Sequence, residues 1–254
     1  MKGFLIQTIG GEIVHDFNFT LLRAIEYEEW RTGEKIPVVR CEMEDMMPES
    51  DLIPSGTVEF VKNWIWMNLG EYEPVPLNVP PHLFEFAGRW IKNVRTKSEM
   101  EEFQGEVFIK STEIVKSGYN CFTDWPTFSS DRIPEASYQI SERVDIISEY
   151  RCFVWMDQLR GIQWYSGDFT RFPDVQTIEK IIKKEPWDFG HGKGLKAWSF
   201  DVGILKNGQT IIIEAHEIYS LGLYGFSDYQ IYVYMLRSGW KDMVRRLEND
   251  KTVH

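Results

Sequence analysis

The chain has few cysteines, no surplus of positive charge and no long hydrophobic run. Among its 254 residues only Cys41, Cys121 and Cys152 are cysteines, and none has a Cys-x-x-Cys spacing. An odd, widely spaced set argues against a disulfide framework and against a zinc ribbon. The formal net charge is −11, whereas duplex binding requires a basic stripe, so we expect no nucleic-acid partner.

The hydrophobic stretches are too short for a membrane protein. None approaches the ~20 apolar residues of a membrane span, and the apolar start over residues 1–9 is too short for a signal peptide. Together with the cysteine pattern, this predicts a cytoplasmic protein without a membrane partner. The basic clusters at 180–184 and 245–246 are typical of solvated helix faces.

Apolar content and proline placement indicate the domain organisation. Hydrophobic residues make up 43% of the chain, which suffices for a substantial core in one large domain or two small ones. Residues 73–81 are dense in proline. Proline fixes φ and removes a backbone donor, so this stretch predicts an extended connector. We therefore expect an α/β domain at 1–80 and a second domain at 81–254.

Hydrophobic periodicity and turn residues predict an α+β (mixed α/β) fold. In the first domain, strands are expected at 2–9, 13–15 and 36–40, a loop at 51–57, and helices at 19–29 and 58–69. Asn18 or Thr20 is the expected N-cap of the first helix. In the second domain, strands are expected at 107–110, 150–156, 160–165, 197–204 and 209–215, and helices at 97–103, 174–184 and 228–248; residues 137–142 lead into the Glu142 motif. Asn207-Gly208 is a strong hairpin signal.

Three motifs in the second domain contain side chains that suit a nucleotide or metal site. Residues 107–110 form a short apolar run that ends at Lys110, where a cation suits a nucleotide phosphate. Glu142 lies seven residues before Glu149, and Arg151 follows two later. Arginine presents a rigid five-donor fork that suits an anionic intermediate better than lysine does. Taken singly, Lys110 also fits an edge-strand lysine that blocks aggregation, and the two glutamates fit a solvated strand face.

The third spacing joins Asp201 to Glu214 and His216. Asp201 precedes Glu214 by thirteen residues, and His216 follows two later. Side chains at i and i+2 of a strand point to one face, as two ligands of one hard cation must. Without its partners, Glu214 would be an ordinary strand end.

In their order and spacing these motifs resemble an ATP-grasp enzyme, over about the last two thirds of the chain. The wider sequence around these motifs is similar to that of small ATP-grasp proteins found in bacteria and phages. The resemblance implies an ATP-grasp nucleotide-binding fold with mixed and antiparallel sheets, preceded by a small pre-ATP-grasp-like α/β region. It also implies that ATP and Mg²⁺ bind in the cleft of that fold.

The resemblance assigns the nucleotide contacts residue by residue. Lys110 would bind phosphate and act in catalysis, and Lys116 is a candidate second lysine. Glu142 and the backbone of Arg143 and Val144 would hold adenine, and Glu149 would take the ribose hydroxyls. A loop over residues 117–124 would cover the triphosphate.

The resemblance also assigns the metal ligands and the catalytic arginine. Asp201, Glu214 and His216 would hold magnesium between the phosphates, although the family usually has asparagine where this chain has His216. Imidazole suits manganese or zinc better than magnesium, so His216 either binds a softer ion such as Mn²⁺, contacts a phosphate oxygen, or does neither. Arg151 would be catalytic; the alternative is a cross-strand ion pair with Asp168 or Glu149.

Three functions remain open from the sequence. The resemblance favours a ligase that joins a carboxylate to an amine through an acyl phosphate, releasing ADP. A kinase on the same scaffold would stop at phosphoryl transfer to a hydroxyl. A non-catalytic nucleotide-binding or interaction module is the third. Residues 219–225, a glycine-containing stretch after the metal motif, would meet the acceptor substrate, or would be a turn with packing tyrosines.

Overall fold

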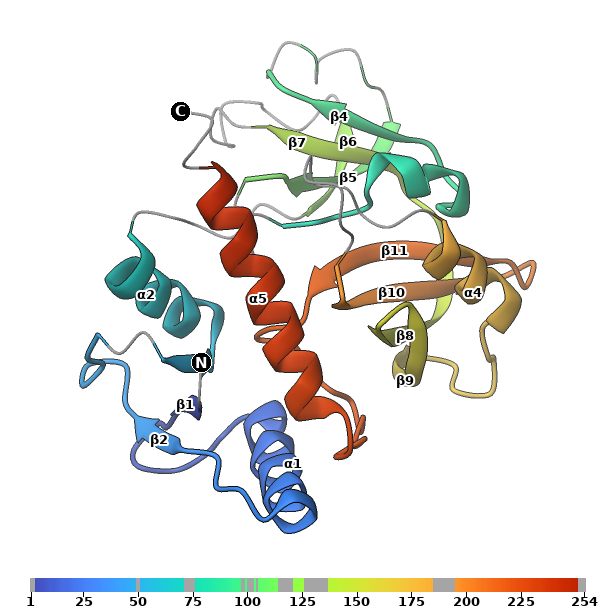
Figure 1. Cartoon of the computed structure of the whole chain (residues 1–254). Helices are drawn as coiled ribbons and strands as arrows, with labels where there is room; N and C mark the ends of the chain where they lie inside the picture. Colours follow the sequence, from blue (N-terminus) through green and yellow to red (C-terminus); the bar gives the residue numbers. More distant parts are fainter. Residues whose placement is uncertain are drawn as a thin grey trace.

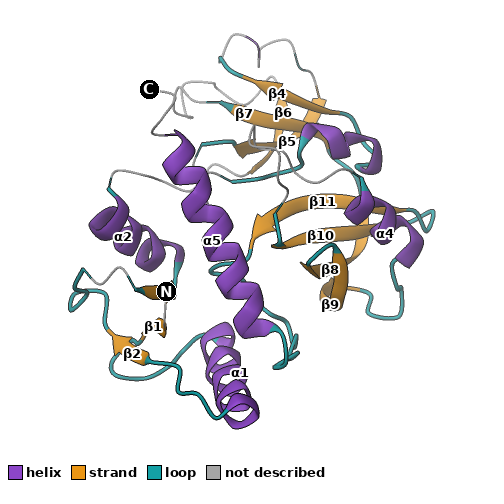
Figure 2. Cartoon of the chain, viewed as in Figure 1, coloured by secondary structure: helices purple, strands orange, loops and turns teal. Residues whose placement is uncertain are grey.

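A computed structural model describes residues 3–48, 51–70, 76–96, 99, 103, 105–113, 121–125, 137–184 and 195–250. The chain forms three β-sheets with helices packed around them (Figures 1 and 2). Parallel and antiparallel sheets occur together with helices, which confirms the predicted α+β class. No described helix has both the length and the apolar character needed to cross a membrane.

The N-terminal sheet is parallel, in the order β2-β1-β3. Its strands are β1 (Gly3–Gln7), β2 (Val38–Cys41) and β3 (Leu52–Ser55), and its helices are α1 (Asp16–Thr32) and α2 (Val58–Leu69). The predicted bounds of α2 are confirmed, and Thr57 caps it by accepting a hydrogen bond from the Phe60 amide. The strand predicted at 13–15 is wrong, because residues 13–15 lie outside any strand.

Two further predictions in this layer are wrong for a packing reason. His15, not Asn18 or Thr20, is the N-cap of α1. Asn18 is fully buried inside the helix, where its side chain bonds the Gln7 carbonyl and the Ser55 hydroxyl. The loop predicted at 51–57 contains β3, whose four residues are all buried beside β1. A parallel strand covered on both faces lacks the polar–apolar alternation that marks a strand in sequence.

A small antiparallel sheet follows, in the order β4-β7-β5-β6. Its strands are β4 (Ile91–Val94), β5 (Gly105–Ser111), β6 (Cys121–Trp125) and β7 (Tyr138–Glu142), preceded by the 3₁₀ helix η1 (Pro81–Phe86). The triphosphate loop predicted at 117–124 is corrected in part, because residues 121–124 belong to β6. Residues 117–120 lie outside the described residues, as does most of the helix predicted at 97–103.

The largest sheet has the order β11-β10-β8-β9 and is antiparallel. Its strands are β8 (Ile146–Trp155), β9 (Gln158–Gly167), β10 (Ala197–Leu205) and β11 (Thr210–Glu217), and its helix is α4 (Val175–Lys183). The hairpin predicted at Asn207-Gly208 is confirmed as the turn between β10 and β11, and the strands predicted at 150–156 and 160–165 pair as β8 and β9. Asp174 caps α4 by accepting hydrogen bonds from the amides of Gln176 and Thr177, so the helix begins at Val175, one residue after the predicted start.

Helix α5 (Tyr232–Asp250) runs between the N-terminal layer and the largest sheet (Figure 1). The sequence predicted its start four residues earlier, at 228. On α5, Trp240 meets Trp64 of α2 edge to face at 5.1 Å, and one apolar core cluster holds residues of both regions. The connector predicted at 73–81 is described only from residue 76 onward, and the boundary at residue 80 stays a prediction.

Candidate active site

A cleft of about 600 Å³ opens between the small antiparallel sheet and the largest sheet. Strands β5 and β7 supply one wall, and β8, β9 and β11 supply the other. A third side comes from the chain after β11 and from Val58, the first residue of α2. The charged or hydroxyl-bearing side chains in the lining include Arg89, Lys110, Ser141, Glu142, Glu149, Arg151, Tyr165, Glu214 and His216.

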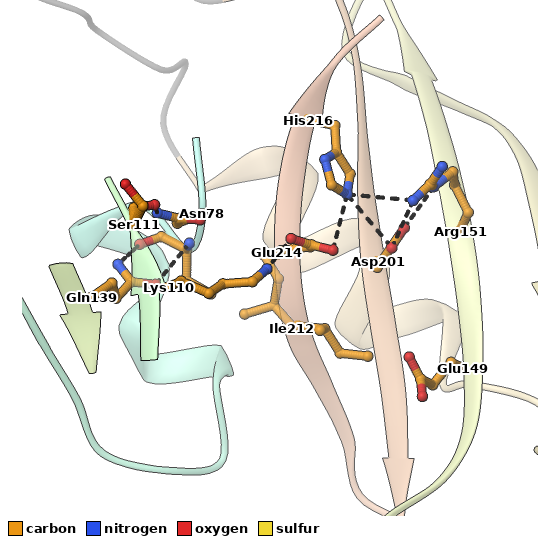
Figure 3. Close-up of polar contacts among 12 residues, drawn as sticks. Asn78, Lys110, Ser111, Gln139, Glu149, Arg151, Asp201, Ile212, Glu214 and His216 are labelled. Carbon is orange, nitrogen blue, oxygen red and sulfur yellow. Dashed lines mark hydrogen bonds and ion pairs between the residues drawn. The ribbon is translucent and has the colours of Figure 1, made fainter. Parts of the chain in front are cut away.

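Glu214 and His216 line this cleft, and the buried Asp201 lies beside them (Figure 3). Asp201 on β10 lies directly opposite Glu214 on β11. The imidazole Nε2 of His216 lies 3.4 Å from Glu214 Oε1 and 3.5 Å from Asp201 Oδ2. One ligand atom from each residue falls within 4.8 Å of the others. Two carboxylates and an imidazole at this separation form a donor set that fits a divalent cation such as Mg²⁺ or Mn²⁺.

Asp201 forms a buried ion pair with Arg151. The two residues are cross-strand neighbours on β10 and β8, and the guanidinium binds the carboxylate in a two-pronged fashion at 2.8 and 2.9 Å. Both side chains are buried, at 8% and 2% exposure. The expected alternative partners of Arg151, Asp168 and Glu149, are therefore wrong. Asp168 instead lies near Arg171.

Lys110 reaches across the cleft to Glu214. Its strand β5 belongs to the small sheet, whereas Glu214 belongs to the largest one, and the ammonium and carboxylate form an ion pair (Figure 3). Both side chains are mostly buried, at 12% and 26% exposure. In this structure the cation predicted for phosphate and a carboxylate predicted for metal therefore neutralise each other.

The charges of the cluster shift its pKa values in consistent directions. Burial raises the pKa of Glu214, but the charges of His216 and Lys110 outweigh it and hold that pKa well below its usual range. Burial likewise opposes ionisation of Asp201, and hydrogen bonds from Arg151 and His216 nevertheless lower its pKa. Burial lowers the pKa of His216, yet the neighbouring Glu214 and Asp201 leave it raised overall. The cluster thus favours the ionised form of both carboxylates, and these carboxylates in turn favour the protonated form of the imidazole when no metal is bound.

Tyr165 on β9 links two of the acidic side chains. Its hydroxyl lies 2.8 Å from Glu149 Oε2 and 3.1 Å from Asp201 Oδ2. Burial and the Asp201 charge raise its pKa, so Tyr165 is a hydrogen-bond donor at any ordinary pH. A hydroxyl has one hydrogen to donate, and the two carboxylates compete for it.

The predicted nucleotide residues fall into three groups. Glu142, Val144 and Glu149 line the cleft near Phe108, Ile146 and Ile213, which puts carboxylates beside an apolar surface. The side chain of Arg143 is not among the cleft residues; it pairs with Glu106 at 2.7 Å on the exposed surface, although the prediction concerned its backbone. Lys116 lies outside the described residues.

Several cleft residues have no sequence motif that would reveal them. Arg89, Tyr165 and Tyr224 are examples. Tyr224 stacks on Tyr165 at 4.9 Å and lies under the Arg151 guanidinium at 5.1 Å. It has a φ of 50°, as Ser220 has one of 52°, so the 219–225 segment adopts left-handed backbone without glycine at those two positions. A segment strained in this way is often functional, and this one lines the cleft.

Comparisons with known proteins support the fold. No curated protein sequence matches the chain. Among solved structures, D-cycloserine synthetase DcsG is similar at 12% identity with a TM-score of 0.57, covering 92% of this chain and 98% of that one. The ATP-grasp ligase PsnB, complexed with minimal precursor, is similar at 11% identity with a TM-score of 0.52, covering 93% and 99%. At such identities the likeness concerns the fold.

The family assignment comes from the sequence of the domain itself. The model of the ATP-grasp domain, R2K clade family 2, matches residues 86–234, which is more than half of the chain. The match includes Lys110, Glu142, Glu149, Arg151, Asp201, Glu214 and His216, all of which except the buried Asp201 line the cleft. This protein belongs to the ATP-grasp superfamily, in family 2 of the R2K clade.

Proposed function

We propose that this protein is an ATP-dependent ligase that joins a carboxylate to an amine through an acyl phosphate. One observation carries the proposal. In a member of the ATP-grasp superfamily, Lys110 of one sheet pairs across a cleft with Glu214 of another sheet, and Asp201 and His216 lie beside that carboxylate. A cation that would bind phosphate and three side chains that would bind a divalent metal thus lie together, where a nucleoside triphosphate would bind.

The reaction has two balanced steps. A carboxylate oxygen of the first substrate attacks the γ-phosphorus of ATP, the bond to the β-phosphate oxygen breaks, and ADP leaves. The amine nitrogen of the second substrate then attacks the acyl carbon and loses a proton, and the carbon–oxygen bond to phosphate breaks. An amide, ADP and inorganic phosphate result. The chain contributes positioning and charge stabilisation rather than covalent chemistry.

The nucleotide would lie along the cleft between the two sheets. Lys110 would leave Glu214 for the phosphates, because a phosphate chain offers an ammonium more negative charge than one carboxylate does. The Glu142–Val144 segment would hold adenine against Phe108 and Ile146, and Glu149 would accept hydrogen bonds from the ribose hydroxyls.

Asp201, Glu214 and His216 would hold the divalent ion, and that ion, when bound, offsets charge on the β- and γ-phosphates. The residues fit this role because their donor atoms converge without rearrangement of the strands. Arg151, on β8, forms an ion pair with the carboxylate of Asp201. From there its charge would stabilise the acyl phosphate and the developing phosphate leaving group.

The acceptors would enter beside residues 219–225. Tyr219, Ser220, Leu221, Gly222 and Tyr224 line the end of the cleft next to His216. Ser220 donates a hydrogen bond to the Gly56 carbonyl, and the Leu223 amide donates to Asp16. The segment is thereby fixed to the N-terminal layer, which would give the acceptor pocket a rigid wall.

The ligase is tested by incubation with MgATP, candidate carboxylates and hydroxylamine. Hydroxamate forms from an acyl phosphate, so its accumulation together with ADP is the expected result. A phosphorylated acceptor without hydroxamate would indicate a kinase on the same scaffold. Absence of any metal-dependent ATP binding in calorimetry would indicate a non-catalytic module and would overturn the proposal.

A further inference from the structure

Arg89 binds the backbone of β11 immediately before Glu214. Its Nη1 donates to the Ile212 carbonyl at 2.9 Å, and its Nη2 donates to the Ile213 carbonyl at 3.2 Å. The same Nη1 also donates to the carbonyl of Ala87 at 3.0 Å. One guanidinium thus holds two consecutive carbonyls of a strand that carries metal-type ligands.

That geometry depends on a β-bulge. Asp201 pairs with Glu214, whereas the next residue, Val202, pairs with Ile212, so Ile213 is an extra residue without an opposite partner. In a regular ladder the carbonyls of successive residues point to opposite sides, and one fork could not reach both. A bulge breaks that alternation and re-aims the side chains that follow it. Here the side chain that follows is Glu214.

Residues 87–90, a corner of the chain that contains Arg89, pack closely against β11. Gly88 has a φ of +61°, and a Cβ at this position would come within 2.4 Å of the Ile211 side chain. Glycine is therefore required both by the backbone conformation and by the close approach. Further along, the Ala215 amide donates to the Asn78 carbonyl at 2.7 Å. The outer edge of β11 is thus held on both sides of Glu214.

The same corner contacts the strand that carries Glu142. The Glu142 amide donates to the carbonyl of Trp90 at 3.2 Å, and Arg89 Nε lies 3.4 Å from the Ser141 hydroxyl. Burial lowers the pKa of Arg89 to about 10, so the guanidinium stays charged at neutral pH. Residues 87–90 therefore join the two sheets at the cleft through a charged, multiply bonded side chain.

We propose that Arg89 is a positioning residue of the metal site: by clamping the Ile212 and Ile213 carbonyls it fixes the bulge that holds Glu214 opposite Asp201. The inference rests on the proposed function, because it assigns Glu214 to the metal. Arg89 itself touches neither ion nor reacting atom in this scheme. Lysine cannot replace it, since an ammonium lacks the planar fork that spans two carbonyls.

The test compares Arg89→Lys and Arg89→Met with the matched pair Arg23→Lys and Arg23→Met, where Arg23 is an exposed residue of α1 paired with Glu26. Free Mn²⁺ is measured by electron paramagnetic resonance in the presence of a non-hydrolysable ATP analogue. Loss of a residue that orients a metal ligand typically weakens metal binding roughly 10- to 100-fold. We expect that loss in both Arg89 variants and unchanged affinity in both Arg23 variants.

A second measurement tests, without any ligand, whether Arg89 holds the backbone of β11 in place. Hydrogen–deuterium exchange of the peptide containing residues 209–217 should accelerate in Arg89→Met and, to a smaller extent, in Arg89→Lys. Faster exchange with unchanged Mn²⁺ affinity would overturn the proposal, since Arg89 would then only stabilise the strand. If Arg89→Met does not fold, Arg89→Lys decides by the same two measurements.

The two proposals fail in different ways. If the wild-type protein binds no Mn²⁺ with the nucleotide analogue, the proposed function fails, whatever the Arg89 variants do. If the wild type binds Mn²⁺ and both Arg89 variants bind it within about 2-fold of wild type, the positioning role fails and the proposed function stands.

Discussion

Lys110 and Glu214 form an ion pair that bridges two sheets, with the ammonium on β5 and the carboxylate on β11. A second pair, between Arg151 and Asp201, lies on the other side of His216. Each carboxylate that would bind a metal is therefore already neutralised by a cation that would serve the phosphates. Binding of a metal–nucleotide complex would exchange these partners rather than create new unpaired charge.

Replacing Lys110 by methionine should weaken ATP binding. The ammonium would make a charge-assisted contact with phosphate, and such contacts contribute about 1.5–3 kcal/mol, so the dissociation constant should rise roughly 10- to 100-fold. Calorimetry in the presence of Mg²⁺ measures it. Lys183→Met on the exposed face of α4 is the control and should bind ATP normally. Equal affinity in both variants would remove Lys110 from the nucleotide site.

Glu214→Gln and Asp201→Asn should both lower turnover by about 10²-fold or more, because each removes a charge from the metal. Their stabilities should differ. Glu214 pairs with Lys110 at the wall of the cleft, where its side chain keeps 26% exposure, so Glu214→Gln should lose less stability than Asp201→Asn. Asp201 is the buried partner of Arg151, and breaking such a pair costs about 3–5 kcal/mol. Near-normal ATP consumption in either variant would contradict the metal assignment.

Local signals in the sequence predicted much of the fold. The 3.6-residue period over 58–69 matches α2 at both ends, and Asn207-Gly208 lies at the turn between β10 and β11. The i, i+2 spacing of Glu214 and His216 also predicted that their side chains lie on one face of a strand. These features depend on residues close in sequence, where hydrophobic period and turn chemistry act directly.

Features that depend on distant pairing were not predicted. Arg151 pairs with Asp201 because β8 and β10 are neighbours in a register that sets these two residues opposite each other, and nothing within either strand encodes that register. The bulge at Ile213 and its clamp by Arg89 likewise join segments more than a hundred residues apart. Even β3 was missed, because burial on both faces removes the alternation that would mark it.

Tyr165→Phe should raise the KM for ATP more than it lowers kcat. The hydroxyl contacts Glu149, the proposed ribose ligand, at 2.8 Å, and loss of a hydrogen bond to a charged group costs about 1.5 kcal/mol or more. We expect the KM to rise roughly 10-fold. Tyr27→Phe on α1, where the ring lies against Trp30 and outside the cleft, serves as the control. A change confined to kcat would show that the hydroxyl acts through Asp201 instead.

The metal-free protein should lose stability as the pH rises through the pKa of His216. Folding raises that pKa through Glu214 and Asp201 above the value near 6.5 of the unfolded chain. The contribution of the imidazolium is therefore fully present below about pH 6.5 and disappears above the raised pKa. Melting curves in EDTA from pH 5 to 9 would measure it. The same pH dependence in His216→Asn would assign it to other groups.

The choice of metal should reveal the role of His216, whose imidazole lies against both carboxylates. If the imidazole is a ligand, Mn²⁺ should support ATP turnover at least as well as Mg²⁺, because softer ions accept nitrogen more readily. Turnover should fall as the pH drops through the imidazole pKa, since a protonated ring cannot coordinate a metal. His216→Asn replaces the nitrogen donor by an amide oxygen and should shift the preference towards Mg²⁺, measured as the ratio of the two rates. An unchanged ratio would show that the metal is held by Asp201 and Glu214 without the imidazole, whose contacts with both carboxylates would then only orient them.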